Sequence, residues 1–275
     1  MSKRIVYYYQ TFNGLKDILY KGTPVTHIHL SSVHFGVKNG YKYIQLNDNL
    51  PSDPIFYPVW SDIAAAAKLG IKIVLMIGGA GGGYNALFSD FKTYYDFLYL
   101  TLTAHPYITG IDLDVEEEVK LSDIQMLMKQ IKRDFPHFTI SFAPFQSSLE
   151  SDHPGLGGFS YKELYNSPEG KLIDYFNGQF YSDYSETALS RCIQTGYPAS
   201  KVVMGMLSEQ DFSQITKQLK IIIKEQPELG GVFIWEYFNA PKGWDKTIKA
   251  IYIGESTDQL MNLMESIAIS PCSIS

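Results

Sequence analysis

The sequence predicts an α/β fold, a single (β/α)8 TIM barrel, because eight β-rich runs alternate with helical patterns along a chain of 275 residues. Eight strand–helix units in about 250 residues match the usual size of such a barrel. We expect one domain over 1–275, since no linker or low-complexity segment divides the chain. The expected strands are 4–9, 26–33, 72–78, 108–114, 139–145, 175–181, 201–207 and 231–235.

Several helices are indicated by their ends and by apolar residues at helical spacing. Ser61 is placed to cap a helix over 62–69, which Gly70 ends. Residues 122–125 read Ser-Asp-Ile-Gln, a capping box that opens a helix with an apolar face up to Phe135. The remaining helices are expected over 212–222, 244–252 and 258–267.

A doubly wound sheet is the alternative arrangement for alternating strands and helices. Such a sheet favours a glycine-rich nucleotide fingerprint after a strand, and the glycine-rich run 78–83 does follow a predicted strand. The spacing of this run does not fit G-x-G-x-x-G, because Tyr84 occupies the last position, and the chain has no Gly-Lys-Ser/Thr phosphate loop. The barrel is therefore the favoured fold.

Composition narrows the range of partners. The net charge is −6 with no run of Lys or Arg, so neither nucleic acid nor an anionic membrane is an expected partner. We also expect a monomer. No stretch of 18 apolar residues is present. The N-terminus runs straight into a strand pattern without the features of a signal peptide. A cytoplasmic location is the simplest expectation, although a trimmed secreted chain would look the same.

Cysteine and histidine give little sign of disulfide or metal chemistry. Cys192 and Cys272 are too few for a disulfide framework. His27 and His29 alternate on a predicted strand, but no third ligand is in view, so we interpret them as polar strand positions. We expect neither a metal nor a cofactor.

The most informative segment is 110–116, where Asp112, Asp114 and Glu116 alternate with apolar residues. On a strand, the three acids share one face and the apolar residues share the other. Burying that much like charge costs several kcal/mol unless protons or partners are supplied. A solvated edge strand is one interpretation. The favoured one is a catalytic site in which the pKa values of the acids are pushed apart, so that one carboxyl stays protonated as a general acid.

The run 109–116 resembles the Asp-x-x-Asp-x-Asp-x-Glu motif on the fourth barrel strand of glycoside hydrolase family 18, the chitinase family. Thr109 stands where the family usually has the first Asp, and Val115 stands where many members have an aromatic residue. Both lie on the face away from the acids, so we expect these departures to affect packing more than proton transfer.

Further motifs extend the resemblance over most of the chain. Residues 76–79 resemble the Ser-x-Gly-Gly motif, with Met76 in place of Ser, and residues 143–144 match an Ala-Pro element. Gln179-Phe180-Tyr181 resembles the Met/Gln-x-Tyr motif, after which Ser182 replaces a common Asp and Asp183 follows. Trp235 matches the Trp that floors the −1 sugar subsite. The short interval 207–212 leaves no room for the α+β insertion of one chitinase subgroup, so a short single barrel is expected.

The resemblance implies a retaining glycoside hydrolase that cleaves β-1,4-linked N-acetylglucosamine, as in chitin or chito-oligosaccharides. Asp114 is a poor nucleophile, because its α-carbon lies only about 6.6 Å from that of Glu116 on the same face of one strand. The 2-acetamido oxygen of the substrate then supplies the nucleophile, as in the substrate-assisted exceptions to the two-carboxylate scheme.

Each candidate site residue has an expected role. Glu116 is the acid and base, and Asp114 accepts a hydrogen bond from the acetamide. Asp112 is expected to share a proton with Asp114. The other candidates contact substrate: Tyr181 donates its hydroxyl to the acetamide, and Gln179, Trp235, Tyr8 and Asp183 line the subsite. The resemblance also implies cis peptide bonds at Trp235-Glu236 and His34-Phe35.

Two other functions remain open for this sequence. An endo-β-N-acetylglucosaminidase acting on N-glycans shares the acids and the mechanism. A catalytically silent chitinase-like lectin is disfavoured, because silent relatives usually lose the Glu and this chain keeps Glu116.

Overall fold

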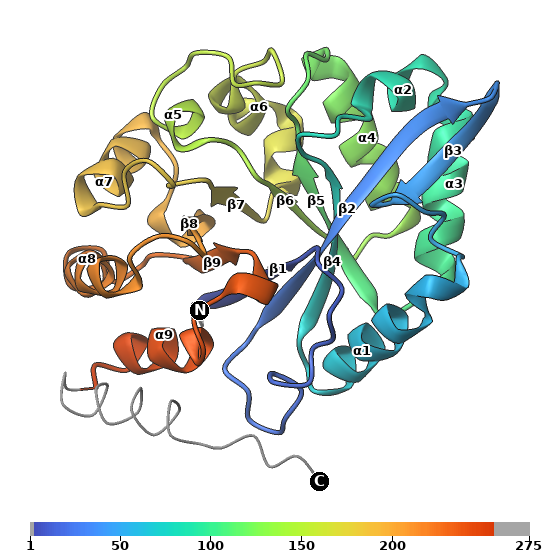
Figure 1. The fold of residues 1–275 in the computed structure, drawn as a ribbon. Helices are drawn as coiled ribbons and strands as arrows, with labels where there is room; N and C mark the ends of the chain where they lie inside the picture. Colours follow the sequence, from blue (N-terminus) through green and yellow to red (C-terminus); the bar gives the residue numbers. More distant parts are fainter. Residues whose placement is uncertain (1–2, 256–275) are drawn as a thin grey trace, which may run out of the picture.

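The computed structural model describes residues 3–255, which form a closed barrel of eight parallel strands surrounded by helices (Figure 1). β1 pairs with β9 on one side and with β2 on the other, so the sheet closes on itself. The predicted barrel is confirmed, and an open doubly wound sheet is excluded. The barrel strands are β1 (Arg4–Tyr9), β2 (His27–Lys38), β4 (Lys72–Gly78), β5 (Ile108–Asp114), β6 (Thr139–Phe142), β7 (Tyr175–Gly178), β8 (Val202–Leu207) and β9 (Gly231–Trp235).

Helices and short 3-10 turns cover the outside of the barrel (Figure 1). The helices predicted over 212–222 and 244–252 are confirmed as α8 and α9, whereas 258–267 lies outside the described residues. Only a short turn separates β8 from α8, so no α+β domain is inserted there. The helices are α1 (Tyr57–Lys68), α2 (Tyr84–Ser89), α3 (Phe91–Ala104), α4 (Leu121–Asp134), α5 (Gln146–Leu149), α6 (Tyr161–Asn166), α7 (Glu186–Thr195), α8 (Phe212–Glu225) and α9 (Trp244–Tyr252), and the turns are η1 (Pro54–Phe56), η2 (Pro168–Leu172), η3 (Ala199–Lys201) and η4 (Tyr237–Asn239).

Two predicted helix starts were wrong. α1 begins at Tyr57, because η1 leads directly into it and Asp53 caps η1 by accepting a hydrogen bond from the Ile55 N–H at 3.0 Å. Ser61 is therefore inside the helix rather than at its cap. α4 begins at Leu121 without a side-chain cap, and Ser122 lies in its first turn. In both cases the helix starts upstream of the residue that the capping rules favoured.

Strand lengths also differ from the prediction. β6 and β7 end three residues early, because Pro144 has no N–H to continue the ladder and only an isolated bridge joins Phe145 to Gln179. β2 is longer than expected. It continues to Lys38 and pairs antiparallel with β3 (Tyr41–Leu46), forming a hairpin that projects from the barrel (Figure 1).

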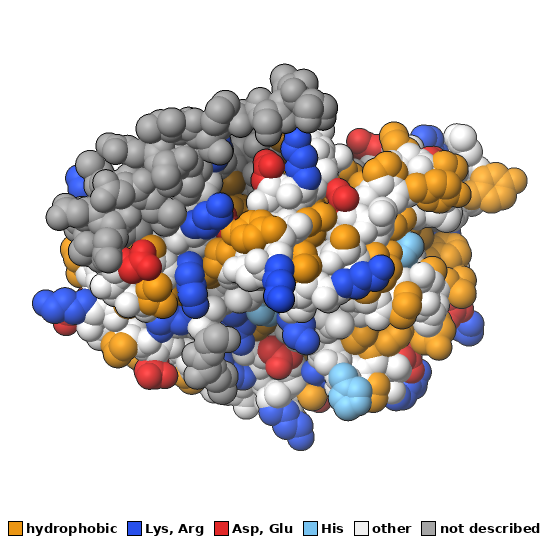
Figure 2. All heavy atoms as spheres, turned by 90° about the horizontal axis from the view of Figure 1, so that it is seen from below, with side chains coloured by type: hydrophobic (Ala, Val, Ile, Leu, Met, Phe, Trp, Pro, Cys, Tyr) orange, Lys and Arg blue, Asp and Glu red, His pale blue; other side chains and the backbone are white. Residues whose placement is uncertain are grey.

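The hairpin side of the molecule carries exposed apolar side chains. Val37 and Tyr41 in the hairpin, and Ile55 and Tyr57 after it, are all exposed. Seen from below in Figure 2, hydrophobic side chains gather toward this side, while Lys and Arg are dispersed among uncharged atoms across the rest of the visible face. Among the described residues, no helix is both long and apolar enough to cross a membrane.

The barrel has two separate cores. The larger core lies between the strands and the helices. It includes Ile111 and Leu113 from the apolar face of β5, and Val115, which follows the end of the strand. The smaller core fills the barrel interior, with Tyr181 and Trp235 packed on it. Its members are Val6, Tyr8, Met76, Tyr175, Val203 and Phe233. The acid residues of β5 therefore face the smaller, interior core.

Interior packing predicts the effect of one added methyl group. In β8, a Cβ at Gly205 would lie 1.9 Å from Cζ of Phe233, its neighbour on β9. We expect Gly205→Ala to lower the free energy of unfolding by about 1–3 kcal/mol, as overpacked cores do. Urea unfolding of Gly205→Ala, Phe233→Leu and the double variant measures this. The double variant is expected to recover part of the loss, and strictly additive losses would contradict the clash.

Candidate active site

The three acids lie along one strand and reach from the barrel centre to its mouth. β5 pairs with β4 and β6, so the solvated edge-strand interpretation is wrong. Asp112 lies within the strand and is fully buried, Asp114 is its last residue and is 6% exposed, and Glu116 follows the strand end and is partly exposed. The alternation predicted for this segment places all three acids toward the interior and the mouth.

Asp112 is bound by side chains from four other strands. Its Oδ2 accepts a hydrogen bond from the Tyr8 hydroxyl at 2.7 Å and lies 3.2 Å from Nδ1 of His29. Its Oδ1 accepts from the Ser141 hydroxyl at 2.6 Å and from the Asn177 amide at 3.1 Å. A carboxylate has about four acceptor positions, and these four contacts fill them.

These contacts affect the protonation of Asp112. Burial alone would raise its pKa, but the charge of His29, with the hydrogen bonds from His29, Ser141 and Tyr8, holds the pKa below its usual value. The lowered pKa favours the ionised form of Asp112, and the sharing of a proton with Asp114 stays a prediction. His29, interpreted from sequence as a plain polar strand position, contacts Oδ2 of Asp112 through its Nδ1.

The pKa values of the two outer acids shift the other way. Burial, together with the charges of Glu116 and Asp112, raises the pKa of Asp114 well above its usual value. Burial also raises the pKa of Glu116, and a hydrogen bond from Gln179 opposes this rise. The pKa of Asp112 is thus lowered while those of Asp114 and Glu116 are raised. Such a separation between the pKa of Asp112 and those of the outer acids lets one carboxyl keep its proton, as a general acid requires.

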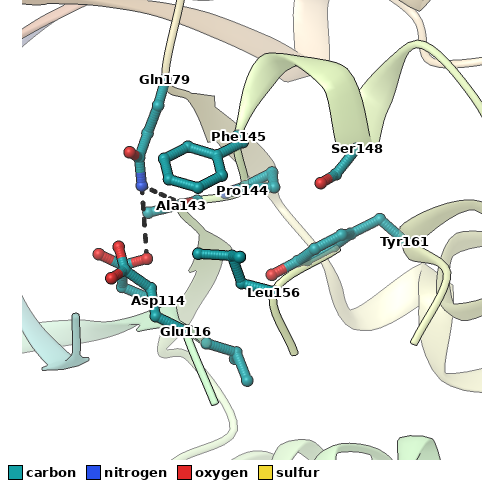
Figure 3. Close-up of a pocket in the computed structure, with 10 residues that line it drawn as sticks. Asp114, Glu116, Ala143, Pro144, Phe145, Ser148, Leu156, Tyr161 and Gln179 are labelled. Carbon is teal, nitrogen blue, oxygen red and sulfur yellow. Dashed lines mark hydrogen bonds between the residues drawn. The ribbon is translucent and has the colours of Figure 1, made fainter. Parts of the chain in front are cut away.

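Asp114 and Glu116 form one wall of a small cavity (Figure 3). On the opposite side, the amide of Gln179 points toward the acids, with Nε2 2.8 Å from the Ala143 carbonyl oxygen and 3.5 Å from Oδ1 of Asp114. Phe145 and Leu156 also line the cavity and are 39% and 47% exposed. No motif indicated Phe145 or Leu156, because isolated apolar loop residues carry no sequence signal.

The predicted aromatic residues meet at the barrel mouth. Tyr8 and Trp235 are in ring contact at 5.3 Å between centroids, and Tyr181 packs edge-on against Phe233 at 6.2 Å. Tyr8 is almost fully buried and its hydroxyl is engaged by Asp112. The structure therefore uses Tyr8 to hold Asp112, whereas Trp235 and Tyr181 are partly exposed.

The segment after Trp235 is anchored by a buried carboxylate. The Trp235-Glu236 peptide is cis, as predicted. Glu236 is 7% exposed and accepts hydrogen bonds from the N–H groups of Gln10 and Thr11 at 2.9 and 3.0 Å, and from the Thr11 hydroxyl. These bonds join the chain that follows β9 to the chain that follows β1, next to the indole.

The second predicted cis peptide was misplaced. The bond is at Ser31-Ser32 rather than at His34-Phe35. Pairing of β2 with β4 shifts register between Leu30 and Val33, and Val33 is the last residue of β2 that pairs with β4. His34 and Phe35 belong to the hairpin extension. The error follows from taking the end of the strand pattern as the end of the barrel strand.

The glycine-rich loop 78–83 packs around the acid strand rather than around a phosphate. At Gly78, where φ is +91°, a Cβ would lie 2.3 Å from the Asp114 carbonyl oxygen. The start of α2 is occupied by Glu117, which accepts hydrogen bonds from the N–H groups of Tyr84 and Asn85. This carboxylate takes the position that an anion would need.

Asp183 is not brought to the acid group. Its Oδ2 lies 2.9 Å from Nη2 of Arg191, which also binds Glu150 at 2.8 Å. Hydrogen bonds from Ser185 and Arg191 lower the pKa of Asp183. Asp183 thus pairs with Arg191 of α7, and its expected contact with substrate stays a prediction. Within residues 3–255, no cluster of three or more His, Cys, Asp or Glu is arranged to hold a metal.

The raised pKa of Asp114 predicts a pH-dependent stability. Above about pH 3.9, Asp114 keeps its proton in the folded protein but loses it in the unfolded chain. The contribution of Asp114 to the free energy of unfolding therefore falls as the pH rises toward its folded pKa. We expect Asp114→Asn to stabilise the protein at pH 7 by about 1.4 kcal/mol for each unit of that pKa difference, with the gain vanishing near pH 3. Urea unfolding at both pH values measures it.

Asp112→Asn is the matched comparison, because it replaces a buried carboxylate that accepts hydrogen bonds from three side chains. We expect it to lower the free energy of unfolding at pH 7 by about 1–3 kcal/mol, the cost of leaving a buried polar group without its partner. An Asp114→Asn variant less stable than the wild type at pH 7 would contradict the raised pKa.

Plant chitinases are among the sequence relatives of the chain. It is 28% identical to an acidic endochitinase of Cicer arietinum over 213 residues, which cover 68% of this chain and 70% of that protein. It is 24% identical to an acidic endochitinase of Vitis vinifera over 207 residues, or 66% and 68% of the two chains. No protein-family model matches the chain.

Solved structures give a fuller match. A fungal endo-β-N-acetylglucosaminidase of glycosyl hydrolase family 18 is 30% identical, with 90% of this chain and 97% of that chain covered and a TM-score of 0.80. The chitinase ChiC of Aspergillus fumigatus is 28% identical, with 96% and 99% covered and a TM-score of 0.82. With its barrel and its acid strand, the chain belongs to glycosyl hydrolase family 18 and is a glycosidase of the chitinase type.

Proposed function

We propose that this glycosidase hydrolyses β-1,4-linked N-acetylglucosamine in chitin or chito-oligosaccharides, with retention of configuration and with the substrate supplying the nucleophile. The observation that carries the proposal is the one-sided placement of the acids. Asp114 and Glu116 are the only carboxylates among the residues lining the cavity, and both come from the end of β5.

A protein nucleophile would need a carboxylate about 5–5.5 Å from the acid, on the other face of the sugar. The rest of the cavity lining carries no carboxylate; it consists of Val115, Ala143, Pro144, Phe145, Ser148, Leu156, Tyr161 and Gln179. Other carboxylates that follow the barrel strands are engaged elsewhere. Glu117 binds the start of α2, Asp183 binds Arg191 and Glu236 binds the chain after β1.

The steps follow from these positions. Glu116 gives its proton to the glycosidic oxygen as the bond from that oxygen to C1 breaks. The 2-acetamido oxygen attacks C1 and forms an oxazolinium ion, which Asp114 stabilises by accepting a hydrogen bond from the acetamide N–H. Water then attacks C1 and gives a proton to Glu116, restoring the acid. An intramolecular nucleophile can have an effective molarity of roughly 10⁵ M or more, so orientation is the main task of the site.

The remaining residues orient the substrate in this scheme. The Trp235 ring stacks beneath the −1 sugar, and the hydroxyl of Tyr181 and the amide of Gln179 hold the acetamide. Phe145 and Leu156 offer apolar surface next to Glu116, where the leaving group departs.

Cleavage of N-glycans by an endo-β-N-acetylglucosaminidase activity is the second candidate. The observation in its favour is the relative of that name with 30% identity over 90% of this chain. Both activities use the same acids, so the substrate decides between them.

Replacement of the general acid tests the assignment of Glu116. We expect Glu116→Gln to lower kcat for chitotetraose by roughly 10²–10⁴-fold while leaving oligosaccharide binding largely intact, because the amide keeps the shape but cannot donate the proton. Glu118→Gln, an exposed position two residues further on, is the matched control and should keep wild-type turnover. Near wild-type kcat in a folded Glu116→Gln protein would remove Glu116 from this role.

Substrate comparison by mass spectrometry tests the mechanism and the substrate class together. We expect chitotetraose to be cleaved and its fully deacetylated counterpart to survive, because only the first carries the acetamido nucleophile. Efficient cleavage of the deacetylated oligomer or of cellotetraose would indicate a protein nucleophile. Cleavage of a high-mannose glycopeptide, with chitotetraose left intact, would favour the second candidate.

A further inference from the structure

The turn that follows β8 is closed by both the backbone and the side chain of Gln210. The Gln210 N–H donates to the Leu207 carbonyl oxygen at 3.3 Å, and the side-chain Oε1 accepts from the Leu207 N–H at 2.8 Å. The side-chain Nε2 donates to the carbonyl oxygen of Tyr181 at 2.7 Å, 29 residues away in the sequence. One side chain therefore joins the end of β8 to the segment that follows β7.

The two partners of the Gln210 amide fix the direction in which it points. The Leu207 N–H can only donate a hydrogen bond, and the Tyr181 carbonyl can only accept one. The amide oxygen must therefore face Leu207, and the amide nitrogen must face Tyr181. An amide side chain supplies both bonds at once, whereas an ionised carboxylate can only accept and an ammonium group can only donate.

Tyr181 depends on this bond because it lies beyond the end of the sheet. β7 ends three residues before Tyr181, and its pairing with β8 ends there too. Gln179 is still held by the neighbouring chain after β6, through its isolated bridge to Phe145. Among residues 3–255, no backbone-to-backbone hydrogen bond reaches Tyr181, so the bond from Gln210 is the one that holds its main chain.

The same turn also holds the main chain of Trp235. Leu207 pairs with Trp235 in the sheet, and the N–H of the next residue, Ser208, donates to the Trp235 carbonyl oxygen at 2.9 Å. The turn 207–210 therefore contacts the main chains of both aromatic residues that are assigned to the −1 subsite. Its backbone holds Trp235, and its Gln210 side chain holds Tyr181.

The Tyr181 ring lies close to the acids, on the main chain that Gln210 holds. It packs on the interior core, edge-on to Phe233 with ring centroids 6.2 Å apart. Burial, together with the charges of Asp114 and Glu116, raises the pKa of Tyr181 well above its usual value. The phenol therefore keeps at neutral pH the proton that it would donate to an acetamide.

We propose that Gln210 is a positioning residue, which holds the main chain of Tyr181 against the turn that also contacts Trp235, so that the phenol orients the 2-acetamido group for attack on C1. This inference rests on the proposed function for its catalytic consequence. Orientation of an intramolecular nucleophile supplies much of its advantage, and a displacement of about 1 Å can cost roughly 10²-fold in rate. Gln210 acts through Tyr181 and contacts no substrate itself.

Kinetics with the substrate that the wild type cleaves, chitotetraose or the glycopeptide, test this role. Gln210→Met keeps the length of the side chain but lacks the amide. We expect it to lower kcat by roughly 10-fold or more and to change KM by less than about threefold, because the substrate still binds but is poorly oriented. Glu209→Gln, at the exposed neighbouring position, is the matched control and should keep wild-type kcat. Wild-type kcat in a folded Gln210→Met protein would overturn the role.

A double-mutant cycle with Tyr181→Phe separates positioning from a general effect on the fold. Tyr181→Phe removes the hydroxyl, so displacement of the ring costs little more if Gln210 acts through that group. We expect Gln210→Met to lower kcat by less than about threefold in the Tyr181→Phe background. Losses that multiply in the double variant would overturn the proposal. Should Gln210→Met fail to fold, Gln210→Glu replaces it, because an ionised carboxylate keeps the bond from the Leu207 N–H but cannot donate to Tyr181.

Crystal structures of the wild type and of Gln210→Met measure the position of Tyr181 without any substrate. We expect the Tyr181 hydroxyl to move by about 1 Å or more relative to Asp114, the scale of displacement that affects rate. An unmoved hydroxyl would overturn the inference. If the wild type cleaves neither substrate, the proposed function fails, and the two structures still decide whether Gln210 positions Tyr181. If the wild type is active and the losses multiply, the proposed function stands and this inference falls.

Discussion

The structure depends on one buried carboxylate, that of Asp112, whose acceptor positions are all occupied by other side chains. Its two oxygens receive side chains from β1, β2, β6 and β7, while its backbone belongs to β5. One anion thus links five of the eight barrel strands across an interior that otherwise holds an apolar cluster. A buried charge is tolerable only when it is paired and fully hydrogen-bonded, so these partners are required together.

This constraint shapes the chemistry further along β5. The partners of Asp112 lower its pKa, whereas burial raises the pKa values of the two acids nearer the mouth. The glycines after β4 let the chain lie against Asp114, and Gln179 reaches the acids from the opposite wall. Glu117 and Glu236, two other carboxylates at the barrel mouth, accept hydrogen bonds from backbone N–H groups. Some carboxylates at the barrel mouth therefore anchor loops, while Asp114 and Glu116 line the cavity.

Features that depend on residues close together in the sequence could be predicted, whereas features that depend on contacts between distant residues could not. The eight strands and the shared face of Asp112, Asp114 and Glu116 come from periodicity, which is local. Trp235 and Gln179 were indicated by family motifs. His29 was missed as a partner of Asp112 because one of several polar residues on a strand carries no local mark of the carboxylate that it meets in the fold. The β2–β3 hairpin was missed as well, since its pairing continues the pattern of a barrel strand.

The ionisation of Asp112 is the most direct test of this account. Carboxyl ¹³C NMR of aspartate-labelled protein, assigned with Asp112→Asn and Asp114→Asn, would follow both residues from pH 3 to 8. The account predicts an ionised shift for Asp112 down to below pH 4, the usual aspartate range, and a protonated shift for Asp114 well above that pH. Titration of Asp112 together with Asp114 near neutral pH would contradict it, because the contacts of Asp112 lower its pKa.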